Sequence, residues 1–133
     1  RHLEICLDAL RECTERVVYS DCHFWYGEID KRWVMSVNYS RRALLQCNLT
    51  PVHCVVHERS LLDECGMFDE SLPNHEDYDL WLRFSEVTNF KHIPIITCAY
   101  SMRGDGSQIS SRVEWMQAGL DSVRARYRKR IAV

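Results

Sequence analysis

Apolar residues recur at helical spacing at the start of the chain and give way to short β-prone runs after residue 15. The first group of apolar positions is Leu3, Cys6, Leu7, Leu10 and Cys13. Their spacing of three or four residues predicts an amphipathic helix over residues 2–14. The run in residues 16–22 predicts a strand, and residues 33–39 predict a second strand. Tyr26-Gly27-Glu28 predicts a turn between them.

The middle of the chain alternates between short helical and extended patterns. Residues 40–47 predict a short helix that ends before Thr50-Pro51. Residues 53–57 predict the next strand. Ser60 to Asp63 has the spacing of a capping box, which predicts another short helix that ends at Gly66.

The last third of the chain predicts two helices separated by extended segments. Residues 74–86 predict a helix with Leu80, Trp81, Phe84 and Val87 on its buried side. Residues 90–93 and 95–101 predict strands on either side of Pro94. A capping box from Ser111 to Glu114 predicts a final helix that runs to about Lys129. This alternation indicates an α/β fold with a mixed sheet, and residues 1–133 form one domain or part of one.

Composition and charge exclude several classes of protein. The net charge is -2, which does not favour a nucleic-acid partner. No apolar run approaches the ~18 residues that span a bilayer, and the sequence does not open with a signal peptide. The seven cysteines include no C-x-x-C pair, a pattern that fits a reducing compartment and predicts a cytoplasmic protein.

One local exception to the low charge is the basic end of the chain. The basic residues there are Arg124, Arg126, Arg128, Lys129 and Arg130. Basic residues in a last helical turn complement the helix dipole, and a solvated helix face is the favoured interpretation. The alternative is peripheral contact with anionic lipid headgroups or with another part of a longer protein.

Three further patterns carry chemistry only as weaker alternatives. His53, Cys54 and His57, with Cys22-His23, supply ligands of the type that zinc prefers. On a strand, however, His53 and His57 share one face and Cys54 points to the other, which argues against one site. A Cys/His hydrolase lacks any local signature of an activated thiol. Gly104 to Ser107 could cradle a phosphate, although a plain turn is favoured by spacing.

The pair Glu76-Asp77 lies where a polar loop meets a predicted helix. A carboxylate at such a place can take a proton from a hydroxyl nucleophile, which is the task of a general base. The spacing alone favours a structural role. Asn74 and Asp77 are placed as in a capping box, and acidic residues in a first turn interact favourably with the helix dipole.

The residues around this pair change that balance. After a hydrophobic strand at residues 55–57, residues 59–70 read R-x-x-L…G-x-F-D-E and residues 76–83 read E-D-x-D-L-x-x-R. This ordered set resembles the signature of glycosyltransferase family 2. Residues 1–22 resemble, more loosely, the helix and strand after the family's metal-binding Asp-x-Asp turn. Residues 100–107 resemble its Y-R…G-S loop.

The resemblance implies a fold and a reaction. Family members with the GT-A fold bind a nucleotide-diphosphate sugar, usually with Mg²⁺ or Mn²⁺, and transfer the sugar to a hydroxyl acceptor with inversion. By the resemblance, Asp77 is the base that deprotonates the acceptor. Glu76 orients Asp77 or binds acceptor hydroxyls.

Four other residues are candidates for the site: Asp69 and Trp81 by their chemistry and position, and Arg103 and Ser107 by the resemblance. Asp69 either caps a turn or meets acceptor hydroxyls, and Trp81 either belongs to the core or floors the acceptor pocket. Arg103 and Ser107 belong to a loop expected to close over the donor. None of these residues is assigned as a metal ligand.

The resemblance covers most of the chain but corresponds only to the second half of a family domain. No equivalent of the nucleotide-binding strands or the Asp-x-Asp turn is present, and Asp21-Cys22-His23 is only superficially similar. We therefore expect a partial GT-A-like sheet without the nucleotide-binding half. Such a chain is not expected to be a competent transferase alone, and its metal ligands would lie mainly outside it. The alternative is a non-catalytic binding module, or a homodimer paired along a bare sheet edge.

Overall fold

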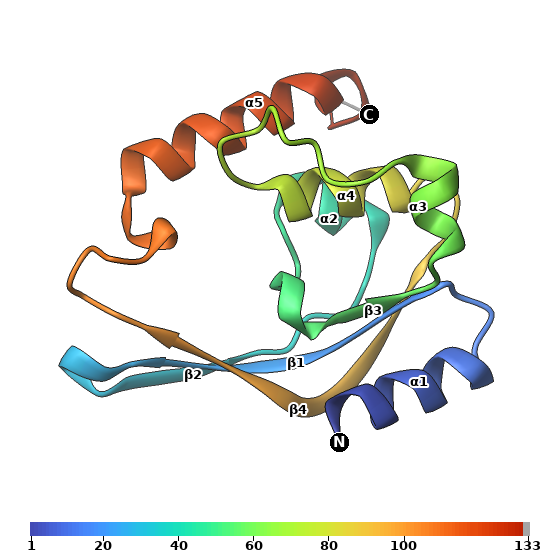
Figure 1. The fold of residues 1–133 in the computed structure, drawn as a ribbon, viewed down its shortest axis with the longest axis horizontal. Helices are drawn as coiled ribbons and strands as arrows, with labels where there is room; N and C mark the ends of the chain where they lie inside the picture. The colour runs from blue at the N-terminus through green and yellow to red at the C-terminus, as the bar shows by residue number, and fades with distance from the viewer. Residues whose placement is uncertain (132–133) are drawn as a thin grey trace.

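The computed structural model describes residues 1–131, without the side chains of Ile109 and residues 128–131. The described residues form a mixed α/β fold with one four-stranded sheet flanked by helices (Figure 1). The strands are β1 (Val17–Tyr26), β2 (Lys31–Met35), β3 (Val55–His57) and β4 (Phe90–Met102). The α-helices are α1 (His2–Glu12), α2 (Arg41–Gln46), α3 (Ser60–Cys65), α4 (Glu76–Phe84) and α5 (Val113–Ile131). Short 3₁₀ turns are η1 (Gly27–Ile29), η2 (Val52–Cys54) and η3 (Ile109–Ser111).

Strand β1 is the centre of the sheet. It pairs antiparallel with β3 over Val17–Tyr19 and with β2 over Cys22–Tyr26, and it pairs parallel with β4 along its whole length. The register between β1 and β4 shifts near Ser20 to Cys22, where β4 contains Pro94. The two segments predicted on either side of that proline therefore form one irregular strand. An edge strand tolerates the missing N–H of a proline.

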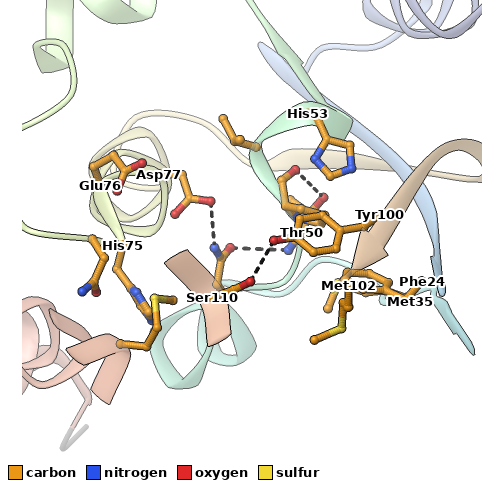
Figure 2. Close-up of a pocket in the computed structure, with 15 residues that line it drawn as sticks. Phe24, Met35, Thr50, His53, His75, Glu76, Asp77, Tyr100, Met102 and Ser110 are labelled. Atoms are coloured by element: carbon orange, nitrogen blue, oxygen red, sulfur yellow. Dashed lines mark hydrogen bonds between the residues drawn. The ribbon is translucent and has the colours of Figure 1, made fainter. Parts of the chain in front are cut away.

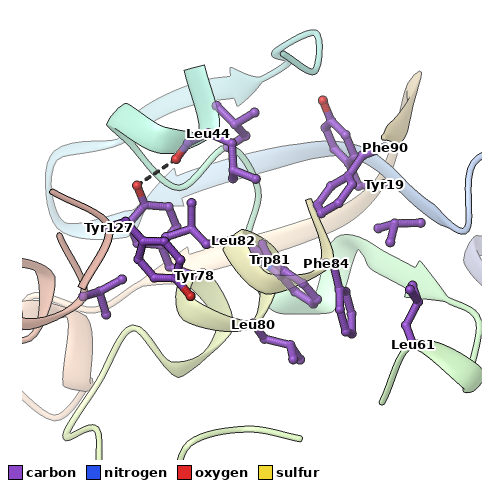
Figure 3. Packing of buried hydrophobic residues seen from close by; sticks show 13 residues of the cluster. Tyr19, Leu44, Leu61, Tyr78, Leu80, Trp81, Leu82, Phe84, Phe90 and Tyr127 are labelled. Atoms are coloured by element: carbon purple, nitrogen blue, oxygen red, sulfur yellow. Dashed lines mark hydrogen bonds between the residues drawn. The ribbon is translucent and has the colours of Figure 1, made fainter. Parts of the chain in front are cut away.

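Helices cover both faces of the sheet (Figure 1). On one face, Cys6 of α1 packs against Val18 and Ile93. On the other face, Trp81, Tyr78 and Phe84 of α4 and Tyr19 of β1 are the largest buried side chains of the main core, which Figure 3 shows between the sheet and the helices. The predicted stripe of Leu80, Trp81 and Phe84 is buried there. Val87 lies beyond the end of α4 and is 44% exposed, so its assignment to the stripe was wrong.

Two predicted capping boxes are wrong. Helix α3 has Arg59 as its N-cap, and the Ser60 hydroxyl donates to Glu58 instead. Helix α4 has His75 as its N-cap, with φ 59°, and Asn74 donates to the carbonyl of Trp115 on α5. The side chains that the local spacing assigned to capping therefore bond elsewhere, Ser60 to the nearby Glu58 and Asn74 across the fold to α5.

Two predictions from composition bear on the cysteines and the helices. All seven cysteines are free thiols in the structure, as expected from the absence of paired spacing. Among the described helices, none has the length and apolar character needed to cross a bilayer.

Candidate functional site

A cavity of about 420 Å³ lies between the start of α4, the loop after α2 and the far ends of β1 and β4. Figure 2 shows Glu76 and Asp77 on one side of it and His53 and Tyr100 on the other. Polar groups on its wall include Asn48, Thr50 and Ser110. The apolar part of the wall includes Phe24, Met35, Tyr100 and Met102. A concave apolar site with a few convergent polar groups is the usual form of a ligand pocket.

Asp77 is the half-buried carboxylate of this cavity. Its Oδ2 accepts a hydrogen bond of 3.2 Å from the side-chain amide of Asn48, and its Oδ1 accepts one of 2.7 Å from the backbone N–H of Tyr78. Burial raises the pKa of Asp77, while the hydrogen bonds from Tyr78 and Asn48 oppose that rise. A carboxylate with a raised pKa is a stronger base than one in water, which suits proton abstraction.

His75 is the N-cap of α4 and lies two residues before Asp77. Its φ of 59° is left-handed, which is uncommon for a residue with a Cβ. Its ring meets that of Tyr78 edge-on, with centroids 6.4 Å apart, and burial lowers the pKa of the imidazole. A neutral ring at pH 7 therefore lies beside the carboxylate on the cavity wall. His75 was not among the predicted site residues, because the local pattern assigned the cap to Asn74.

Two aromatic residues of paired strands form the opposite wall. Phe24 and Tyr100 are register partners on β1 and β4, and their ring centroids lie 5.3 Å apart. The Tyr100 hydroxyl lies 3.0 Å from the hydroxyl of Ser110. Phe24 was not singled out from the sequence, and Tyr100 entered only as the start of the Y-R…G-S loop, because nothing local to either residue shows that the two strands pair in this register. Aromatic faces of this kind can stack on apolar ring surfaces of a ligand.

The structure places two predicted acceptor residues away from this cavity. Trp81 is 2% exposed and packs in the core beside Phe84 and His57, in agreement with the core alternative. Asp69 accepts hydrogen bonds from the backbone and hydroxyl of Ser71, which is the turn-capping alternative, and forms an ion pair with Arg126 on α5. Glu76 lines the cavity with an exposed side chain.

The second half of the E-D-x-D-L-x-x-R motif has a structural role in this fold. The buried carboxylate of Asp79 pairs with Nε of Arg83 at 3.0 Å and with Arg126 at 3.3 Å. Arg83 also donates to the carbonyls of Cys65 and Met67. One guanidinium therefore connects α4 to the loop that follows α3.

The predicted donor loop leaves the sheet next to the cavity. The backbone N–H and hydroxyl of Ser107 both donate to Asp105, and the backbone N–H of Arg103 donates to Gln108. Met102, the last residue of β4, lines the cavity, whereas Arg103 and Ser107 are exposed and do not. The loop is an ordered turn held by its own side chains.

Soft metal-ligand groups gather at one end of the cavity. Ligand atoms of Cys22, His53 and Cys54 all lie within 4.8 Å of one another. Sequence analysis separated His53 from Cys54 by assuming a strand, and that assumption was wrong because both residues lie in η2. His57 lies elsewhere, beside Phe84 in the core.

This group does not fit the Mg²⁺ or Mn²⁺ that the resemblance implies. Both ions prefer oxygen ligands, whereas this group offers two thiols and an imidazole. Among the described residues, no other set of three or more His, Cys, Asp or Glu side chains lies close enough together to hold an ion. We therefore derive no chemistry through Mg²⁺ or Mn²⁺ from the described residues.

The basic end of the chain is partly engaged within the fold. Arg124 donates to the carbonyl of Gln46, and Arg126 pairs with Asp69 and Asp79. The side chains of residues 128–130 lie outside those that the structure describes.

Comparisons with known proteins do not assign this site. No family model matches the sequence, and a search of curated proteins finds no match. The resemblance to glycosyltransferase family 2 therefore depends on the motif residues of the sequence alone.

Proposed function

We propose that this chain forms the acceptor-binding and general-base side of an inverting glycosyltransferase of GT-A type. The observation that carries the proposal is the half-buried carboxylate of Asp77 on the wall of a cavity with aromatic and polar groups. The resemblance assigns the base to this same residue. The position of Asp77 on the cavity wall and its place in the motif therefore both support the proposal.

In the proposed reaction, Asp77 removes the proton from the acceptor hydroxyl as its oxygen attacks the anomeric carbon of the sugar. The bond from that carbon to the nucleoside diphosphate breaks on the opposite face, so the configuration inverts. Asn48 holds the carboxylate through its 3.2 Å hydrogen bond, and the raised pKa of Asp77 favours proton uptake.

The acceptor in this proposal is a glycan or another hydroxyl compound. Phe24 and Tyr100 would stack on its apolar face, while Thr50, Ser110 and Glu76 would meet its hydroxyl groups. The donor nucleotide, with Mg²⁺ or Mn²⁺, would be bound by residues outside this chain. We place donor binding outside this chain because the sequence resembles only the second half of a family domain.

Acceptor binding is tested on this chain by NMR titration with mono- and disaccharides. We expect shifts at Asn48, Thr50 and Asp77, and about tenfold weaker binding in Phe24→Ala, which corresponds to about 1.4 kcal/mol. Trp25→Ala is the matched control, because Trp25 is the next residue on β1 and does not line this cavity. Binding that is equal in both variants would remove this cavity from the proposal.

Transfer is tested in a polypeptide that joins this chain to a donor-binding segment. Asp77→Asn should reduce turnover at least about a hundredfold, since general bases contribute roughly that much, and should leave donor binding intact. Asp63→Asn is the matched control, because Asp63 is an exposed carboxylate on α3 that does not line the cavity. Near-normal turnover of Asp77→Asn would exclude Asp77 as the base.

A self-associating module is the second candidate, and one observation favours it. Among the described strands, β4 pairs only with β1, so no described strand covers its other edge. Ile95 and Ile96 on this strand are 49% and 52% exposed. A long, bare and apolar edge strand favours pairing with another chain.

Light scattering after size-exclusion chromatography distinguishes this candidate. We expect a dimer that Ile95→Lys converts to a monomer, because a lysine on an edge strand opposes pairing. Ile29→Lys, an exposed site at η1, is the control. A wild-type monomer would exclude self-association through this edge.

A further inference from the structure

We propose that Cys22, His53 and Cys54 bind a Zn²⁺ ion, with Cys98 as the fourth ligand. These residues come from β1, η2 and β4, and they meet beside the cavity where Figure 2 places His53. The proposal does not depend on the transferase function. It rests on the convergence of three thiols and one imidazole from three separate segments.

The distances suit the ion. The Sγ atom of Cys22 lies 3.5 Å from Nε2 of His53, and the ligand atoms of Cys22, His53 and Cys54 are mutually within 4.8 Å. In a tetrahedral site, Zn–S is about 2.3 Å and Zn–N about 2.0 Å, which separates sulfur from nitrogen by about 3.5 Å. Small side-chain movements would therefore bring these three ligands to coordination distance.

The backbone explains why consecutive residues share one site. In a strand, His53 and Cys54 would point to opposite faces. The 3₁₀ turn η2 removes that alternation, and its first residue follows Pro51. The buried thiol of Cys54 and the exposed imidazole of His53 therefore reach the same place from one short turn.

Cys98 of β4 offers a third thiol beside this group. It is the register partner of Cys22 across the parallel pair of β1 and β4, so the two side chains leave the same face of the sheet. Its Sγ donates to the carbonyl of His53 at 3.3 Å and lies 3.4 Å from Nδ1 of His2. Rotation of the Cys98 side chain away from His2 would complete four ligands.

The chemistry of the group selects the ion. Thiolate and imidazole are the ligands of structural zinc sites, which bind four protein groups. The position of this group also gives the ion a structural role. Residues 50–53 form one wall of the cavity. Zinc at this point would fasten that wall to β1 and β4 and would stabilise the folded chain.

The test uses the reduced chain of residues 1–133 with Zn²⁺ and with Co²⁺ as a spectroscopic probe. We expect one Zn²⁺ per chain, and with Co²⁺ a thiolate-to-metal charge-transfer band together with the visible bands of a tetrahedral ion. Zn²⁺ should also raise the melting temperature, and a chelator should reverse the rise. These measurements on the unmodified chain require no variant to fold.

Two variants locate the site. His53→Gln changes an exposed side chain and should weaken binding at least tenfold, since even outer-shell changes cost roughly 10–100-fold. Cys98→Ser should weaken binding and lower the charge-transfer intensity. Cys47→Ser, which alters an exposed cysteine that is not in this group, is the control and should change neither property.

Several results would overturn the proposal. One is a chain with all seven thiols reduced that binds no Zn²⁺, or that gives a Co²⁺ spectrum without a thiolate band. Another is a Zn²⁺ affinity that is the same in His53→Gln as in the unmodified chain. A Cys22–Cys54 disulfide in the freshly purified chain, found by mass spectrometry, would replace the metal site with a redox pair. An unchanged affinity in Cys98→Ser would remove Cys98 as the fourth ligand.

Discussion

The side-chain amide of Asn48 donates a 3.2 Å hydrogen bond to the carboxylate of Asp77, which joins the loop after α2 to the first turn of α4. The bond fixes one carboxylate oxygen on the cavity wall, while the backbone N–H of Tyr78 holds the other. Both donors favour the charged form of Asp77, and burial opposes it. The basicity of Asp77 therefore depends on a residue far from it in sequence.

Removal of that amide should make Asp77 more basic. In Asn48→Ala, the carboxylate loses a donor that lowers its pKa, so the pKa should rise further above the ordinary value. A carboxyl-detected NMR titration measures the change. Gln117→Ala removes an exposed amide on α5 and should leave the titration unaltered. A pKa of Asp77 that falls or stays constant in Asn48→Ala would contradict this account.

Asp77 should also make folding depend on pH. Because the pKa of Asp77 is higher in the folded chain than the ordinary value of 3.8, the folded state binds the proton more tightly. Ionisation of Asp77 therefore lowers the free energy of unfolding as the pH rises from 3.8 through the raised pKa. Asp77→Asn removes that loss.

The stability of Asp77→Asn relative to wild type should accordingly be greater at pH 7 than at pH 3, as urea titrations at both values would show. Asp63→Asn, which changes an exposed carboxylate on α3, provides the control. If the stability of Asp77→Asn relative to wild type increases toward low pH, the prediction is contradicted.

Asp69 should show the opposite dependence. Hydrogen bonds from Ser71 and the guanidinium of Arg126 lower the pKa of Asp69 to about 2. Its ionised form therefore stabilises the fold above pH 3.8, and this contribution is lost as the pH falls toward 2. Asp69→Asn should be less stable than wild type at pH 7, and the difference should shrink between pH 4 and pH 2. Thermal denaturation across this range measures it, and a pH-independent difference would argue for a packing effect.

The Arg83 guanidinium should be costly to remove. Arg83→Ala leaves the buried carboxylate of Asp79 with one partner fewer and frees the carbonyls of Cys65 and Met67. The expected loss is about 3 kcal/mol of unfolding free energy, the low end for a broken buried pair, because Arg126 still contacts Asp79.

The control for Arg83 is an ion pair on the surface. Arg32 pairs with Asp30, and both side chains are mostly exposed, so Arg32→Ala should cost less than about 1 kcal/mol. Equal losses in the two variants by chemical denaturation would show that the contacts of Arg83 add no stability.

Gly119 on α5 should not tolerate alanine. Alanine in place of a helical glycine ordinarily stabilises a helix by roughly 0.5–1 kcal/mol. Here a Cβ would overlap the side-chain carbonyl of the buried Asn74, so Gly119→Ala should instead destabilise by about 1–3 kcal/mol. Adding Asn74→Ala should recover part of the loss of Gly119→Ala, measured as a double-mutant cycle. Strict additivity of the two changes would contradict the clash.

The sequence alone determined the kinds of elements and much of their order. Helical spacing predicted α1, and the β-prone run at residues 16–22 predicted the start of β1. Gly66, with φ 84°, ends α3 as expected, because a glycine adopts that backbone easily. These features depend on residues a few positions apart, so a local pattern contains the information. The assignment of Asp77 as the base also came from a contiguous motif, and it stays a prediction.

Only the tertiary structure decided which residues meet. Phe24 faces Tyr100 because β1 and β4 pair in one register, and Asn48 reaches Asp77 because α2 and α4 lie on the same face of the sheet. The turn η2 brought His53 and Cys54 to one place, whereas the assumed strand would have separated them. The physical reason is that strand register and helix packing are set by burial across the whole core. The residues next to a given position in the sequence therefore do not indicate which distant residues it contacts.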